Sequence, residues 1–174
     1  EDLVKYFMEA SISGASKTQV RRKFKELYNL NDDQIDNLSI LTNSIHKYNS
    51  VIFAQLFHGG MRSPQKLTGV EPLSASRIPC DVSKTGFTRC ASVIDINKII
   101  DDFTSAAIRC VESGFDGIEL HGAHGYLLSQ FLSKKINNRT DIWGGDIYGR
   151  SKIVRDIISS IKNNVPDSFI LGIR

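Results

Sequence analysis

The chain has 174 residues, of which 41% are hydrophobic and 24% are charged. This composition is typical of a globular domain and excludes a collagen-like, low-complexity or mostly disordered chain. The 22 basic and 19 acidic residues give a formal net charge of +3, too small to indicate a nucleic-acid-binding protein. No run approaches the roughly 18–20 uncharged apolar residues that span a bilayer, so we expect no membrane-spanning segment.

Stretches with helical spacing alternate with short apolar runs along the chain. Residues 4–8 suggest a first strand. A helix is predicted over residues 32–45, with Asn31 or Asp32 capping its start, and a strand is predicted over residues 50–57. The remaining predicted elements are a helix over residues 95–112, a strand over 117–120, a helix over about 150–163 and a strand over 168–173.

Helices that separate consecutive strands indicate parallel pairing, because each parallel crossover needs a long connection. About four strands and three crossovers fit either a doubly wound sheet or part of a β/α barrel. Residues 59–93 contain three prolines and several glycines, and we predict a long loop there. Loops of that length are usually functional.

Polar side chains follow the predicted strands at the ends where α/β folds bind ligands. Gln55 interrupts an apolar run, His121, His124 and Tyr126 follow the strand at 117–120, and Arg174 ends the last strand. This set suits an electron-rich or anionic ligand better than a metal ion. For Gln55 two interpretations remain open: a hydrogen-bonded core amide, or a bidentate partner of a planar heterocycle.

The segment from His121 to Tyr126 has three interpretations. Two histidines three apart on a helix could bind zinc, but Gly122 and Gly125 disfavour a helix. The pair could also be purely structural. We favour a non-metal site, in which two neutral imidazoles donate hydrogen bonds to one substrate oxygen and the phenol delivers a proton.

The three cysteines, Cys80, Cys90 and Cys110, form no CxxC pair. An odd, sparse set is typical of reduced thiols, so we expect a cytosolic-type compartment and a cytoplasmic protein.

Residues 114–133 (GFDGIELHGAHGYLLSQFLS) resemble the signature of the old yellow enzyme family of NADH:flavin oxidoreductases, and residues 138–145 (NRTDIWGG) resemble its continuation. Residues 53–58 are similar to the third barrel strand of that family. Residues 9–11 are similar to the end of the second strand, and residues 171–174 to the end of the fifth. The resemblance spans essentially the whole chain.

The resemblance implies an α/β fold, a partial (β/α)8 TIM barrel with about strands 2–5, as one incomplete domain over residues 1–174. It implies FMN as cofactor and hydride transfer from NAD(P)H through the flavin to an activated alkene. The substrate would be a small molecule with a carbonyl or nitro group, such as an enone, an enal or a nitro compound. It implies neither nucleic acid nor membrane as a partner and is compatible with a homo-oligomer.

Site roles follow from the same resemblance. Gln55 would bond the flavin pyrimidine edge, Ala10 would lie against the flavin, and Arg174 would lie near flavin N1 and O2. His121 and His124 would hold the substrate oxygen, and Tyr126 would donate a proton. No metal is implied.

Two departures from the family pattern affect these expectations. An arginine that usually follows the third-strand histidine by three residues stands here four residues on, as Arg62. Family barrels are about twice this long, so we interpret the chain as the central piece of a larger polypeptide. The loops that grip the flavin phosphate would then be missing, and we expect weak or no FMN binding by these residues alone.

Two rival functions remain. One is a truncated, non-catalytic paralogue of the same family that binds flavin or another ligand. The other is a metal-dependent barrel hydrolase using His121 and His124. Against the hydrolase, no carboxylate partner is evident, because Glu119 is expected to alternate away from the barrel interior relative to His121.

Overall fold

The structure is a computed structural model, and it describes residues 34–174. The predicted strand at residues 4–8, the predicted capping residues Asn31 and Asp32, and Ala10 lie outside the described residues.

Three parallel strands form the central sheet. They are β1 (Phe53–Leu56), β4 (Gly117–Leu120) and β5 (Ile170–Ile173), hydrogen-bonded in the order β1-β4-β5. The pairing register aligns Gln55 with Glu119 and Glu119 with Gly172. The parallel pairing predicted from the alternation of helices and strands is confirmed, although β1 and β5 are shorter than the predicted strands.

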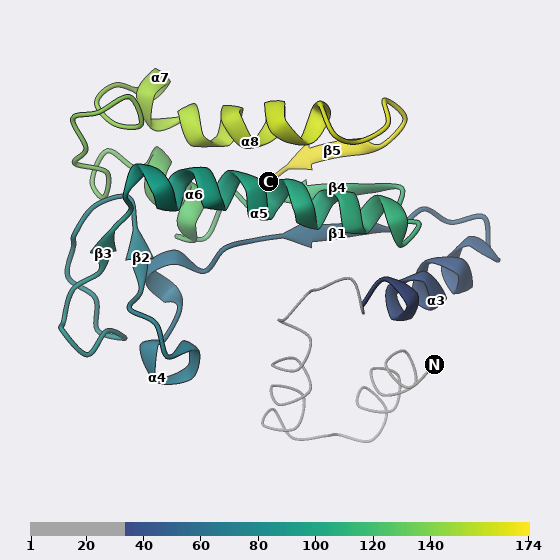
Figure 1. Cartoon of the computed structure of the whole chain (residues 1–174), viewed down its shortest axis with the longest axis horizontal. Helices are drawn as coiled ribbons and strands as arrows, with labels where there is room; N and C mark the ends of the chain where they lie inside the picture. Colours follow the sequence, from purple (N-terminus) through teal and green to yellow (C-terminus); the bar gives the residue numbers. More distant parts are fainter. Residues whose placement is uncertain (1–33) are drawn as a thin grey trace.

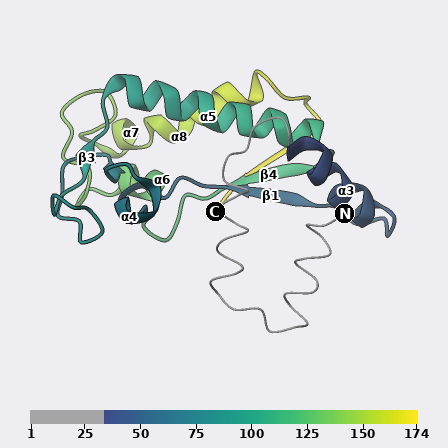
Figure 2. The ribbon, with the colours of Figure 1, turned by 60° about the horizontal axis from the view of Figure 1, so that its bottom comes forward.

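Helices connect these strands in sequence. Helix α3 (Ile35–His46) precedes β1, α5 (Val93–Glu112) joins β1 to β4, and α8 (Lys152–Lys162) joins β4 to β5. Helices α5 and α8 lie side by side over the same face of the sheet (Figures 1 and 2). A doubly wound sheet carries helices on both faces, so this one-sided, sequential arrangement favours the barrel over the doubly wound alternative.

The hydrophobic core lies between the sheet and these two helices. Ile118 and Leu120 of β4 are fully buried there, packed with Ile96 of α5 and Ile157 of α8. Successive side chains of a strand point to opposite faces, so the alternate residues of β1 and β5 lie on the other face. On that face Phe53 is 42% exposed and Ile170 is 53% exposed. We call it the open face.

Helix α5 begins two residues before the predicted start, because Asp95 belongs to a capping box. The Ser92 hydroxyl accepts a hydrogen bond from the Asp95 amide, and the Asp95 carboxylate accepts one from the Ser92 amide. Arg89 donates two hydrogen bonds to the same carboxylate and holds the pKa of Asp95 well below its usual range. An acidic residue in the first turn also interacts favourably with the helix dipole.

Residues 59–93 contain short elements where a loop was predicted. They are a 3-10 turn η2 (Gly60–Arg62), a one-turn helix α4 (Gln65–Thr68) and the paired strands β2 (Leu73–Ser74) and β3 (Arg89–Cys90). Two further short helices, α6 (Leu127–Leu132) and α7 (Ile147–Arg150), follow β4. Each of these elements is too short to give a periodic sequence signal.

All three cysteines are free. Burial raises the pKa of the Cys110 thiol to about 11, so this thiol stays protonated inside the core. Among residues 34–174, no helix is both long enough and apolar enough to cross a bilayer.

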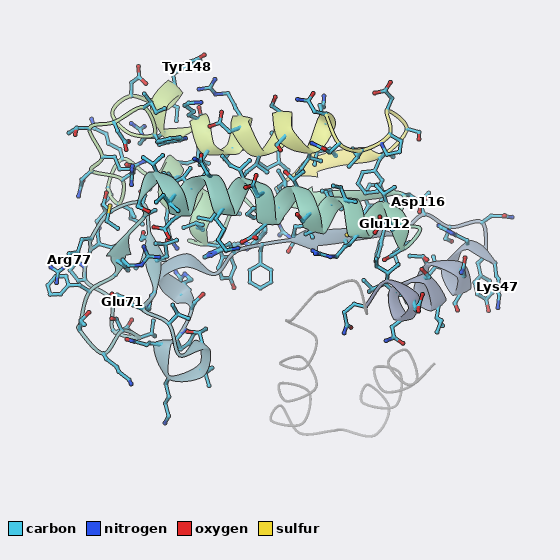
Figure 3. The ribbon with its side chains drawn as sticks, viewed as in Figure 1. Lys47, Glu71, Arg77, Glu112, Asp116 and Tyr148 are labelled. Atoms are coloured by element: carbon cyan, nitrogen blue, oxygen red, sulfur yellow. The ribbon has the colours of Figure 1, made fainter. Side chains whose placement is uncertain are left out.

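At the amino ends of the strands, one carboxylate joins three elements. Asp116 Oδ2 lies 2.9 Å from His46 Nε2 at the end of α3 and 2.7 Å from the Ile52 amide, just before β1. These hydrogen bonds hold the pKa of Asp116 below its usual value. Figure 3 shows Asp116 and Glu112 at one end of the molecule and Tyr148, on α7, at the opposite end.

Replacing Asp116 with Asn should therefore reduce the acid sensitivity of folding. Because the folded state lowers the pKa of Asp116, its stabilisation is present above the unfolded pKa of about 3.9 and is lost as the pH falls through the folded pKa. Urea unfolding measured from about pH 6 to pH 3 should show a smaller loss of stability for Asp116→Asn than for the unaltered chain. Asp102→Asn, which removes the exposed pair with Lys98, is the control and should leave the profile unchanged. Parallel profiles for the unaltered chain and Asp116→Asn would contradict this prediction.

Candidate active site at the carboxyl ends of the strands

The parallel ladder continues one row beyond the strands. The His121 amide donates to the Leu56 carbonyl at 2.9 Å. On the other side, the Arg174 amide donates to the Leu120 carbonyl at 3.0 Å, and the Gly122 amide donates to the Arg174 carbonyl at 2.9 Å. These bonds place Arg174 opposite His121 in the register of β4 and β5.

The open face therefore presents two successive rows of residues. Gln55, Glu119 and Gly172 form the first row, and the second contains His121 and Arg174. Residues two apart along a strand share a face, so both rows lie on the side away from α5 and α8. The structure thus brings Gln55, His121 and Arg174 to neighbouring positions on one face.

The expectation for Glu119 is wrong. Glu119 and His121 are two residues apart and so lie on the same face rather than on opposite faces. The Gln55 side-chain amide donates a hydrogen bond to Glu119 Oε1, which confirms that both side chains lie on the open face. Gln55 is exposed within the described residues, which favours the ligand-binding interpretation over that of a buried core amide.

His121, His124 and Tyr126 gather in the irregular segment between β4 and α6, as the two glycines predicted. His124 Nδ1 lies 3.2 Å from His121 Nε2. The Tyr126 ring centroid lies 5.1 Å from that of His121 and 5.4 Å from that of Phe57. These four residues, Phe57, His121, His124 and Tyr126, form what we call the ring cluster.

Burial indicates which ring nitrogen of His121 carries the proton. His121 is only 5% exposed, and its Nδ1 is buried without a hydrogen-bond partner. A buried N–H without an acceptor is rarer than an unpaired acceptor, so we assign the His121 proton to Nε2, which donates to His124 Nδ1. Among residues 34–174, no three His, Cys, Asp or Glu side chains lie close enough together to hold a metal ion.

The turn after β1 contributes residues that sequence reasoning did not assign to the site. His58 Nδ1 accepts a hydrogen bond from the Gly60 amide at 3.0 Å, and burial lowers the pKa of His58, so its ring is neutral near pH 7. Arg62 Nε lies 3.3 Å from the carbonyl of Gly125, inside the segment that carries the ring cluster.

Gln130 of α6 is fully buried, and the signal that could have found it is a polar residue within an apolar run.

Comparisons with known proteins identify the family and the fold of the chain. The sequence profile of the NADH:flavin oxidoreductase / NADH oxidase family matches residues 10–174. The chain is 40% identical over 136 residues to the flavin oxidoreductase hxnT of Emericella nidulans, covering 74% of this chain and 35% of that protein. It is 38% identical to an NADH oxidase of Thermoanaerobacter brockii, covering 77% of this chain and 21% of that protein. It is 33% identical to 12-oxophytodienoate reductase 2 of Arabidopsis thaliana, covering 77% of this chain and 38% of that protein.

The chain thus spans 21–38% of the length of these three relatives. Among solved structures, the old yellow enzyme homologue from Zymomonas mobilis is similar with a TM-score of 0.74 at 25% identity, over 83% of this chain and 43% of that one. This match confirms the expected fold, part of an α/β barrel. The chain belongs to the NADH:flavin oxidoreductase / NADH oxidase family, the old yellow enzyme family.

Proposed function

We propose that the protein is an FMN-dependent oxidoreductase that uses NAD(P)H to reduce an alkene activated by a carbonyl or nitro group. The observation that supports this most directly is the position of Gln55, His121 and Arg174 on the open face, beside the ring cluster. The site then contains an amide, a cation and two imidazoles at the end of the sheet where barrel enzymes bind their ligands.

The described residues fit a flavin ring. The pyrimidine edge of an isoalloxazine alternates donors and acceptors, which a primary amide such as Gln55 can match. Glu119 accepts from the Gln55 amide nitrogen, so the Gln55 carbonyl oxygen stays available as an acceptor. Gly172 lies beside Glu119 in the same row, and a Cβ there would have only the Ile118 carbonyl within 4 Å, at 3.7 Å, so a flat ring can approach the backbone.

Bound FMN would supply the hydride chemistry. The fixed charge of Arg174, in the row beside His121, would stabilise negative charge on a ring held by Gln55. Ala10, outside the described residues, would contact the same ring.

The two histidines can hold a substrate oxygen with the nitrogens that now face each other. In the free protein His121 Nε2 donates to His124 Nδ1. If His124 adopts the other tautomer, with its proton on Nδ1, then His121 Nε2 and His124 Nδ1 are both donors. One substrate oxygen between them can then accept both hydrogen bonds. Negative charge that develops on a carbonyl or nitro oxygen would strengthen both bonds, which is how such donors accelerate a reaction.

We assign to Tyr126 the donation of a proton to the substrate carbon. Its ring packs between those of His121 and Phe57, so its position is restricted on two sides. A phenol O–H is a hydrogen-bond donor and can act as a general acid.

In the complete protein, replacing Gln55 with Leu should weaken flavin binding by about tenfold or more, because a hydrogen bond contributes about 0.5–1.5 kcal/mol and a bidentate Gln55 would make two. Quenching of flavin fluorescence during titration with the protein measures this affinity. Gln65→Leu is the matched control, because Gln65 belongs to α4 rather than to the sheet and accepts a hydrogen bond from the Lys84 amide. Equal flavin affinity in Gln55→Leu and the unaltered chain would remove Gln55 from the proposed site.

Replacing both His121 and His124 with Ala should weaken the binding of a phenolate by about 3–6 kcal/mol, because two hydrogen bonds to a charged oxygen are lost. Titration with 4-nitrophenol, followed by its phenolate absorbance in the flavin-loaded protein, measures the effect. His46→Ala removes a histidine at the opposite ends of the strands and should change nothing in this assay. Unchanged phenolate affinity in the double variant would exclude the oxyanion role.

Replacing Tyr126 with Phe should slow the consumption of an enone such as 2-cyclohexenone by about 10²–10⁴-fold, the usual contribution of a general acid. The oxidation of NAD(P)H with dioxygen as acceptor should keep its rate, because that reaction needs no proton on an alkene carbon. Equal slowing of both reactions would contradict the proton-donor role. If the unaltered protein binds flavin but carries out neither reaction, the non-catalytic alternative is correct.

A further inference from the structure

One buried amide bridges the turn after β1 and the segment after β4. Gln130 of α6 is fully buried, and its Nε2 donates to the Gly125 carbonyl at 2.7 Å. Its Oε1 accepts a hydrogen bond from the Met61 amide at 3.2 Å. The two ends of the amide therefore hold backbone groups of two segments that are far apart in sequence, Met61 and Gly125. A buried polar side chain must make its hydrogen bonds inside the protein.

The segment that Gln130 holds has an unfavourable backbone. His124 has a φ of 57° and Gly125 a φ of 73°, so two successive residues adopt the left-handed conformation. A residue other than glycine pays about 1–2 kcal/mol for this conformation, and such strain persists only where neighbouring groups hold it. The Gly125 carbonyl receives two donors, Gln130 Nε2 and Arg62 Nε.

Glycines on both sides make room for the bridge. A Cβ at Gly60, whose φ is 58°, would lie 2.5 Å from Gln130 Oε1. A Cβ at Gly125 would lie 3.0 Å from the Arg62 guanidinium. Side chains at either position would displace the groups that meet at the Gly125 carbonyl.

We propose that Gln130 is a positioning residue of the candidate site. Its hydrogen bond to the Gly125 carbonyl fixes the peptide unit between Gly125 and Tyr126. In this way it keeps the rings of His124 and Tyr126 in contact with the ring of His121. This inference deepens the proposed function, and its catalytic meaning rests on that function. Its geometric content, that the contact between His124 and His121 depends on Gln130, can be tested without flavin.

The test compares Gln130→Met with the unaltered protein by nitrogen-15 NMR of the histidine rings. Met has similar length and is apolar, so it removes both hydrogen bonds while filling the core. In the unaltered protein the His124 Nδ1 and His121 Nε2 resonances should show a mutual hydrogen bond between defined tautomers. In Gln130→Met this signature should be lost, with the His124 ring averaging between tautomers, and 4-nitrophenol should bind the flavin-loaded variant about tenfold more weakly.

Asn137→Leu is the matched control. Asn137 is 5% exposed, and its amide donates to the Phe131 and Trp143 carbonyls at 2.8 Å and accepts from the Arg139 amide at 3.1 Å. It is thus another buried amide with several backbone partners, in a segment without ring-cluster residues. Asn137→Leu should lower stability to a similar extent and leave the imidazole signals unchanged.

A second variant separates the two ends of the amide. Gln130→Glu keeps an acceptor for the Met61 amide but, when ionised, loses the donor to the Gly125 carbonyl. Burial favours the protonated carboxyl, which keeps the donor, so Gln130→Glu should reproduce the imidazole change of Gln130→Met only at a pH high enough to ionise it. If Gln130→Met does not fold, Arg62→Met, which removes the other donor to Gly125 from an exposed side chain, should give the same change in smaller degree.

Unchanged imidazole signals in folded Gln130→Met, or the same loss in Asn137→Leu, would overturn the proposal. Failure of the proposed function gives a different result. In that case the imidazole signature still depends on Gln130, while the unaltered protein binds neither flavin nor 4-nitrophenol.

Discussion

The site depends on the register of the parallel ladder between β1, β4 and β5. In a parallel pair every second residue is hydrogen-bonded to two residues of the next strand, so one register sets the relative level of the two carboxyl ends. Here the ladder continues past the strand ends, because the His121 amide donates to the Leu56 carbonyl and the Arg174 amide donates to the Leu120 carbonyl. His121 and Arg174 are therefore held in the same register as the strand residues. A shift of one residue would turn Gln55, Glu119 and His121 toward the helices.

The helix face of the sheet keeps that register in place. Ile118 and Leu120 are fully buried against α5 and α8, and moving them to the open face would expose two large apolar side chains. Full burial of one such side chain contributes about 1.5–3 kcal/mol. Because side chains alternate along a strand, burial of Ile118 and Leu120 leaves Glu119 and His121 on the open face, where polar groups can contact a ligand.

The sequence was sufficient for the regular parts of this structure and for the side-by-side placement of Gln55, His121 and Arg174. The alternation of helices with strands predicted parallel pairing, and parallel pairing predicted that Gln55, His121 and Arg174 would meet. The error for Glu119 came from misapplying the two-residue period of a strand, since the positions themselves carried the correct information. Residues 59–93 could not be predicted, because β2 and β3 have two residues each and are stabilised by contacts with distant parts of the chain. The contact between the histidines also could not be predicted, because it depends on a left-handed backbone at His124 and on hydrogen bonds from the turn after β1.

The turn after β1 carries the arginine whose position departs from the family pattern. Arg62 ends the 3-10 turn, and its guanidinium contacts the Gly125 carbonyl in the loop beyond β4. The left-handed glycine in that turn lies directly against a buried amide. This stretch should therefore be intolerant of any larger side chain at Gly60, a restriction that homologous sequences would record as an unvarying glycine.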